Sequence, residues 1–208
     1  MPELEIIGVP FSNYVRSVRM LCEEKGITHK LTPSRPHAPD VIAIHPAGQI
    51  PCMRHGDVEI FETKGIATYI DKAFPGPKLI PEDALGAAKV EQWVSYGNAK
   101  VDRWIMREFV VPSVFFDKAK GPDTAKIDAA VPEIDKCAKA LDEALARSPY
   151  LAGSNLTYAD IHVLPMLVTA TGFPATAEVL SKYESLSAYI AKLTELPSFK
   201  NTAPPPRK

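Results

Sequence analysis

A cluster of prolines and one glycine between residues 75 and 81 divides the sequence into two parts with different patterns. Pro75, Gly76, Pro77 and Pro81 interrupt any regular helix or strand in this stretch. Before it, short apolar runs alternate with helical patterns, whereas beyond it only helical periodicity appears. The change predicts a domain boundary near residues 77 to 84, with an α/β domain over 1–78 and an all-helical domain over 85–208.

The first part has the order strand, helix, strand, helix, strand, strand, helix. The apolar run Leu4–Val9 has the length of a buried strand, and Asn13–Lys25 carries apolar residues at helical spacing before Gly26. With a second strand at Ile27–Leu31, this opening predicts a βαβ unit with two parallel strands. The remaining elements are a helical turn at 41–44, a hairpin of strands 50–54 and 58–61, and a helix at 63–73.

The second part consists of amphipathic segments, and its most specific local signal is a capping box. Thr157 and Asp160 have the Thr-x-x-Asp spacing that opens a helix, directly before the apolar run 161–169. Other helices are predicted at 85–118, 123–147, 175–182 and 186–193.

Charge and cysteine content exclude several classes of protein. The 24 basic and 25 acidic residues leave a net charge of −1, so we expect no nucleic-acid partner. Cys22, Cys52 and Cys137 are few, odd in number and far apart, which argues against a disulfide framework and a metal site. No apolar run reaches the roughly 18 residues of a membrane helix, and no secretory signal opens the chain. The expectation is a cytoplasmic protein without a membrane partner.

Three turns of the first part carry polar groups beside predicted strand ends. Ser12 and Asn13 lie where the first strand meets its helix, a place where ligands collect in open α/β sheets, although either residue serves equally as a helix cap. Pro51 stands at a strand entry, where a cis peptide bond would turn the backbone of Ile50 toward a ligand. An ordinary trans proline that starts an edge strand is the alternative.

The third turn, Glu62-Thr63, opens the helix at 63–73. Unpaired backbone N–H groups and the helix dipole favour an anion there, the Thr63 hydroxyl adds a donor, and Glu62 can pair with an ammonium group. The turn therefore suits a zwitterionic amino-acid head, although an acidic residue in a first helical turn also complements the dipole without any ligand.

Taken in order, these features resemble the glutathione transferase family. The resemblance rests on Pro-Ala-Gly-Gln-Ile-Pro at 46–51, on Glu62-Thr63 followed by GIATYID, on the proline-rich linker and on YLAGSNLTYAD at 150–160. It covers essentially the whole chain. It implies a thioredoxin-like, glutathione-binding N-terminal domain (βαβαββα) and an all-α C-terminal domain that binds the second substrate.

The resemblance also implies roles for individual residues. Val9-Pro10-Phe11-Ser12 before the Arg-Val-containing helix is similar to the serine-type classes, such as the phi class and bacterial relatives, which makes Ser12 the expected thiol-activating residue. Asn13 and Tyr14 stay open as alternatives. Residues implied to contact glutathione are Ser12, His37, Gln49, Ile50, Pro51, Glu62 and Thr63, with Arg35 an alternative to His37 for the glycyl carboxylate.

The implied activity is that of a detoxification transferase with glutathione as co-substrate. The glutathione thiolate would attack a small hydrophobic electrophile or a hydroperoxide, in a homodimer and without a metal. No cysteine lies near the first turn, so exchange through a mixed disulfide with the protein is not expected. The alternative is a non-catalytic, glutathione-binding or structural protein of the same fold, because a fold does not fix a function.

Overall fold

The computed structural model describes residues 2–205, which form two compact units. Within the described residues, the first unit holds 2–82 together with 194–205, and the second holds 83–193. The predicted ranges 1–78 and 85–208 remain predictions for the two functional domains.

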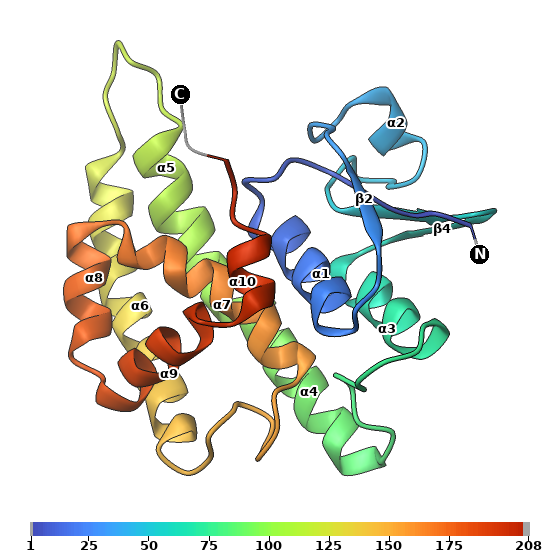
Figure 1. The fold of residues 1–208 in the computed structure, drawn as a ribbon. Coiled ribbons are helices and arrows are strands. Elements are labelled where there is room, and N and C mark those ends of the chain that lie inside the picture. Colours follow the sequence, from blue (N-terminus) through green and yellow to red (C-terminus); the bar gives the residue numbers. More distant parts are fainter. Residues whose placement is uncertain (1, 206–208) are drawn as a thin grey trace. The chain divides into compact units, whose positions relative to one another are not determined.

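A four-stranded sheet with the order β2-β1-β3-β4 forms the centre of the first unit (Figure 1). The predicted βαβ opening is confirmed, because β1 (Leu4–Ile7) pairs parallel with β2 (His29–Thr32) across α1 (Asn13–Glu24). The predicted hairpin is confirmed too: β3 (Cys52–His55) pairs antiparallel with both β1 and β4 (Val58–Phe61). The unit is completed by α2 (Pro39–Ile42), α3 (Thr63–Ala73) and α10 (Pro197–Asn201).

The core of this unit lies on both faces of the sheet. Ile6 and Ile7 are adjacent and therefore point to opposite faces. Ile7 packs with Val41 of α2 and Cys52 of β3, whereas α1 and α3 contact each other and the sheet. Fully buried residues of α1 and α3 include Val15, Val18, Leu21, Ile66 and Ile70.

A buried ion pair joins the ends of α1 and α3. The Lys25 Nζ lies 3.3 Å from Asp71 Oδ1 and donates at 2.8 Å to the Pro77 carbonyl. The Asp71 carboxylate also accepts from the backbone N–H groups of Leu79 and Ile80. Gly26 follows with φ +67 and ends α1 as the sequence predicts. The pair thus fixes both helices to the proline-rich segment that follows α3.

The C-terminal helix α10 belongs to the first unit, which the sequence pattern does not reveal. The Arg16 guanidinium lies 3.7 Å from the centre of the Phe199 ring and donates at 2.8 Å to the Phe199 carbonyl. Burial, with the nearby charge of Arg19, lowers the pKa of Arg16 to about 10. Residues 202 to 208 look like a disordered tail in the sequence, yet Thr202 is fully buried; residues 206–208 lie outside the described range.

The second unit is helical. The predicted segment 85–118 contains α4 (Ala84–Tyr96), a π-helical stretch η1 (Gly97–Val110) and α5 (Val111–Val114). The Val111 N–H donates to the Met106 carbonyl, the i→i+5 pattern of a π-helix. The other helices are α6 (Thr124–Leu145), α7 (Tyr158–Thr171), α8 (Pro174–Ser181) and α9 (Glu184–Thr194). The predicted capping box at Thr157 and Asp160 is present.

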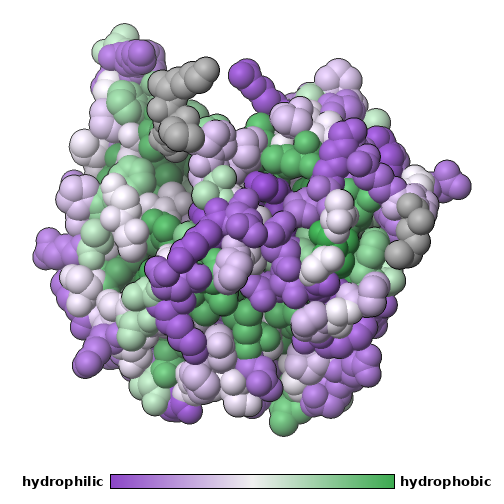
Figure 2. Space-filling view, in the orientation of Figure 1, coloured by the Kyte–Doolittle hydropathy of each residue, from purple (hydrophilic) through white to green (hydrophobic). Residues whose placement is uncertain are grey.

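The length and apolar character of the described helices bear on whether they could cross a membrane. Over residues 2–205 no single helix is long and apolar enough to cross a membrane, and α7 with α8 reach that length only together, across a 120° bend. Figure 2 shows hydrophilic and hydrophobic residues intermixed over the face that it draws.

Candidate active site

The strand register brings the three predicted turns to one edge of the sheet. Ile7, the last residue of β1, pairs with Thr32 at the end of β2 and with Cys52 at the start of β3. Cys52 in turn pairs with Phe61, the last residue of β4. The segments that contain Ser12, Ile50-Pro51 and Glu62-Thr63 therefore all adjoin the same edge. The sequence predicts these turns separately, and the pairing shows that they are neighbours.

Close packing at Gly8 fixes the first two turns against each other. A Cβ at position 8 would lie 2.5 Å from Val15 Cγ2 and 3.2 Å from Ile50 Cβ, and Gly8 also has φ +156. Only glycine allows such an approach. Val15 belongs to the first turn of α1, so the missing side chain lets Ile50 pack close to the start of that helix.

Ser12 is the N-cap of α1. Its Oγ accepts from the Val15 backbone N–H at 3.3 Å, and its own N–H donates to the Val9 carbonyl at 3.1 Å. The predicted capping role is therefore confirmed. A serine oxygen has two lone pairs and one hydrogen, so the capping bond leaves the hydroxyl hydrogen available to a ligand. Asn13 and Tyr14 follow in the first turn, and the Tyr14 carbonyl accepts from Ser17.

The Ile50–Pro51 peptide bond is cis, as the resemblance implies. The strand ladder begins only at Cys52, and over residues 2–205 the backbone N–H and C=O of Ile50 have no hydrogen-bond partner in the chain. Gln49 is exposed beside it. Burial raises the pKa of the neighbouring Cys52 thiol to about 11, which keeps this cysteine protonated at neutral pH.

Glu62 and Thr63 occupy the start of α3. Glu62 has φ +65, a left-handed conformation that is unfavourable for a residue with a Cβ, and its side chain is 68% exposed. It is the N-cap residue of α3, but its side chain makes no capping hydrogen bond. Thr63 is buried. The strained backbone thus presents a carboxylate at the surface.

His37 lies in the loop between β2 and α2, with φ +64 and an exposed side chain. Its N–H donates to the Gly48 carbonyl at 2.8 Å, which ties this loop to the segment before Gln49. A Cβ at position 48 would come within 2.5 Å of the His37 ring nitrogen Nδ1, so glycine is required there. Arg35 is exposed on the same loop.

One residue of this edge is absent from the sequence prediction. His45 is buried, and its Nε2 lies 3.6 Å from Glu62 Oε1. The available signal was its position directly before the Pro46–Pro51 run, but no periodic pattern distinguishes it from a core histidine.

Comparisons with known proteins agree with this geometry. The family model described as "Glutathione S-transferase, N-terminal domain" matches residues 6–78, and "Glutathione S-transferase, C-terminal domain" matches residues 102–197. The chain belongs to the glutathione S-transferase family.

Individual relatives show how far the similarity to other glutathione S-transferases extends. Glutathione S-transferase 3 of Zea mays is 29% identical, over 99% of this chain and 98% of that protein. The crystal structure of glutathione transferase F7 from Populus trichocarpa superimposes with a TM-score of 0.85 at 28% identity, covering 96% of this chain and 97% of that one. Elongation factor 1-gamma of Prunus avium is 26% identical over 85% of this chain but only 39% of its own length.

In this glutathione S-transferase the turn before α3 is Glu62-Thr63, and Thr63, which supplies a hydroxyl group at this edge of the sheet, is buried.

Proposed function

We propose that this chain is a glutathione S-transferase in which Ser12 activates the glutathione thiol. The observation that carries the proposal is the position of Ser12: its oxygen caps α1 while its hydroxyl hydrogen has no acceptor within residues 2–205. A thiol of pKa about 8.5 is mostly protonated at neutral pH. A hydroxyl donor at the positive end of a helix stabilises the thiolate, which then attacks an electrophilic carbon or a hydroperoxide.

The rest of the sheet edge is suited to hold the tripeptide. The unpaired backbone of Ile50, next to Pro51, pairs with the cysteinyl main chain, and Gln49 lies beside it. The Glu62 carboxylate binds the ammonium group of the γ-glutamyl residue, and the Thr63 hydroxyl is a further donor for the α-carboxylate of that γ-glutamyl residue. His37, on an exposed loop tied to Gly48, takes the glycyl carboxylate.

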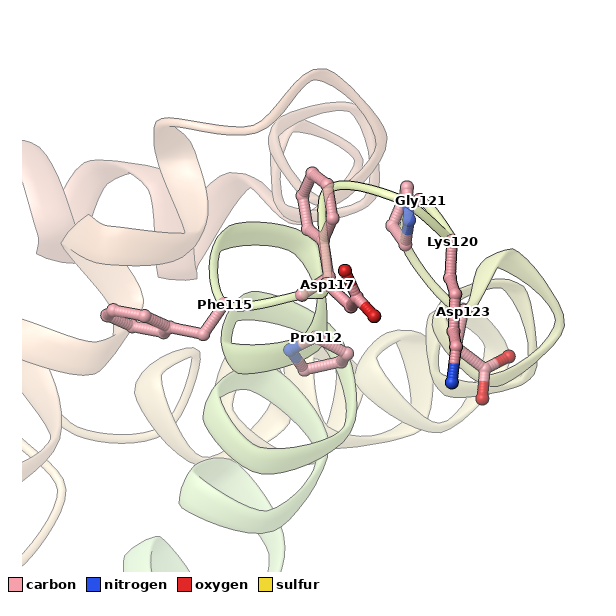
Figure 3. A pocket seen from close by; sticks show the side chains of 8 residues that line it. Pro112, Phe115, Asp117, Lys120, Gly121 and Asp123 are labelled. Carbon is pink, nitrogen blue, oxygen red and sulfur yellow. The ribbon is translucent and has the colours of Figure 1, made fainter.

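The helical unit supplies the second-substrate site in this proposal. An open pocket of about 350 Å³ lies at the loop between α5 and α6, a volume within the usual range for small ligands. Its lining combines apolar side chains of Pro112, Phe115, Phe116 and Pro122 with Asp117, Lys120 and Asp123. Figure 3 shows these residues around the loop, with Phe115 pointing outward, and this side chain is 75% exposed. Such a surface favours a small hydrophobic electrophile.

Turnover and retention together test the proposed function. We expect the protein to bind immobilised glutathione, and to conjugate glutathione to an activated aryl halide or reduce an organic hydroperoxide. The similarity to elongation factor 1-gamma favours one alternative, in which the chain has the glutathione transferase fold but does not catalyse a reaction. Retention on glutathione without turnover of any of these substrates would favour that alternative, and failure to bind would reject both catalytic and binding proposals.

A homodimer in the cytoplasm completes the proposal. The edge strand β4 exposes the apolar side chain of Val58, which a second copy of the chain would cover. The three cysteines are free thiols, which suits a reducing compartment.

The proposed dimer predicts the effect of a charge on β4. We expect the wild-type protein to have the mass of two chains in light scattering, and Val58→Glu to shift it toward one chain because a charge would be buried in the interface. Ile42→Glu is the matched control, since Ile42 is also apolar and exposed but lies on α2. A monomeric wild-type protein, or equal effects of both substitutions, would contradict a β4 interface.

A further inference from the structure

We propose that His45 is a positioning residue that orients the Glu62 carboxylate and thereby selects thiols with a free α-amino group. The inference rests on the proposed function and deepens it. It assigns the recognition of the ammonium group to a pair of residues from α2's C-terminal loop and the start of α3, rather than to Glu62 alone.

The first step is that the His45 ring is held in place. Its backbone N–H donates to the Val41 carbonyl at 2.7 Å, and its carbonyl accepts from the Gly48 N–H at 2.8 Å. The side chain is buried, and its ring lies 4.9 Å from the Phe61 ring, centre to centre. The imidazole is therefore a fixed group, not a solvated one.

The second step is the orientation of its two nitrogens. The Ala47 N–H donates to Nδ1 at 3.1 Å, so Nδ1 is the acceptor and the ring proton is assigned to Nε2. Nε2 is the atom that faces Glu62 Oε1, at 3.6 Å. This distance is slightly longer than a hydrogen bond, so in this structure the contact is electrostatic. A small rotation of the exposed Glu62 side chain closes it.

The third step concerns Glu62. Its φ of +65 is a strained conformation, and strain of this kind persists where the surrounding structure imposes it and clusters at functional sites. Over residues 2–205 the Glu62 carboxylate makes no capping bond, and its Oε1 lies 3.6 Å from His45 Nε2. With Nε2–H directed at Oε1, the other oxygen, Oε2, stays available for an ammonium group from outside.

As a consequence, one oxygen of the Glu62 carboxylate faces the His45 donor, and the other oxygen binds the ammonium group of the ligand. An unrestrained glutamate side chain, 68% exposed, loses rotamer freedom when it binds a ligand. His45 restricts that freedom beforehand, so its contribution appears only with ligands that carry the α-ammonium group. A purely structural role of His45 would affect all thiol ligands equally.

The test compares two variants with two ligands. His45→Asn keeps an acceptor near the Nδ1 position for Ala47 but cannot reach Glu62, whereas His45→Gln places an amide donor near the Nε2 position. The ligands are glutathione and its analogue in which hydrogen replaces the α-amino group. Titration calorimetry gives the affinities, and steady-state kinetics give kcat and KM for glutathione.

We expect His45→Asn to weaken glutathione binding about 3- to 10-fold, the range for a contact to a charged group at a partly exposed site. KM for glutathione should rise while kcat at saturating glutathione stays the same. His45→Gln should recover most of the affinity, and the analogue should bind wild type and His45→Asn equally.

Three outcomes would overturn the inference alone, given a wild-type protein that binds glutathione. They are an equal loss for glutathione and the analogue, no loss for either, and a His45→Gln variant that binds as weakly as His45→Asn. Thermal unfolding of the ligand-free variants identifies a folding defect in His45→Asn. In that case, the glutathione affinity of His45→Gln compared with that of the wild type decides whether the inference holds. A wild-type protein that binds no glutathione would instead reject the proposed function, and this inference with it.

Discussion

Replacing Ser12 with alanine is expected to lower kcat/KM for conjugation on the order of 10²-fold, the usual effect of removing one donor to a developing or bound anion. The same substitution should raise the pKa of the bound glutathione thiol by about 1 to 2, since a donor to a charged group contributes roughly 1.5 to 3 kcal/mol. The pH–rate profile should move to higher pH, because the thiolate forms later. Ultraviolet absorbance of the bound thiolate, titrated against pH, measures the shift directly.

The capping bond complicates this experiment, and a second substitution separates the two roles of Ser12. Its Oγ accepts from the Val15 N–H at 3.3 Å, so Ser12→Ala also removes a helix cap. Loss of a cap to alanine costs about 1 kcal/mol of stability, whereas glycine costs only a few tenths. Ser12→Gly should therefore match Ser12→Ala in activity while it unfolds nearly like wild type. Ser12→Thr retains both the cap and the hydroxyl and serves as the positive control.

Substitutions of the two residues that follow Ser12 test whether another side chain activates the thiol. Asn13 and Tyr14 occupy the next two positions of α1. If Ser12 is the donor, Asn13→Ala and Tyr14→Phe should leave the thiol pKa close to the wild-type value. A rise in that pKa in Tyr14→Phe, with none in Ser12→Gly, would transfer the activating role to the tyrosine hydroxyl.

Much of the first unit could be predicted because its signals are local. Strand length, helical spacing and Gly26 identify the βαβ opening, and the turn at residues 55–57 identifies the hairpin. The relation between the three turns follows from strand pairing. Because β3 is antiparallel to both β1 and β4, the last residues of β1 and β4, Ile7 and Phe61, lie at the same edge of the sheet. Local pattern plus the rules of sheet connection therefore predict the place of the candidate site.

The features that escaped prediction depend on contacts between distant residues. His45 acquires its role from Glu62, 17 residues later, through side chains whose meeting no periodicity encodes. Helix α10 packs on α1 through Arg16 and Phe199, although its sequence continues the helical pattern of the other unit. In the π-helical stretch Gly97–Val110 the buried residues Val101, Ile105 and Phe109 recur at a spacing of four, which an α-helix also allows, so spacing alone does not distinguish the two.

The buried pair Lys25–Asp71 leads to the largest expected effect on stability. Both side chains are almost completely buried, and the Lys25 Nζ lies 3.3 Å from Asp71 Oδ1. Removing one partner leaves an uncompensated charge, so Lys25→Met or Asp71→Leu should each destabilise the first unit by about 3 to 5 kcal/mol. The double variant should be more stable than either single variant, although the N–H groups of Leu79 and Ile80 then lack the acceptor that Asp71 provides.

The measurement has to report on the first unit, because both tryptophans, Trp93 and Trp104, lie in the helical unit. Chemical denaturation followed by loss of glutathione binding reports on the sheet and its site, while tryptophan fluorescence reports on the other unit. Lys30→Met, which removes an exposed ammonium group 3.9 Å from both Glu3 and Glu5, is the control and should unfold close to wild type. Single variants as stable as this control would show that the pair makes no net contribution to stability. In the single variants, glutathione binding should be lost at a lower denaturant concentration than the fluorescence change. That result, absent from the wild type, would show that α1 and α3, which begin at the site with Ser12 and Thr63, depend on the ion pair at their other ends.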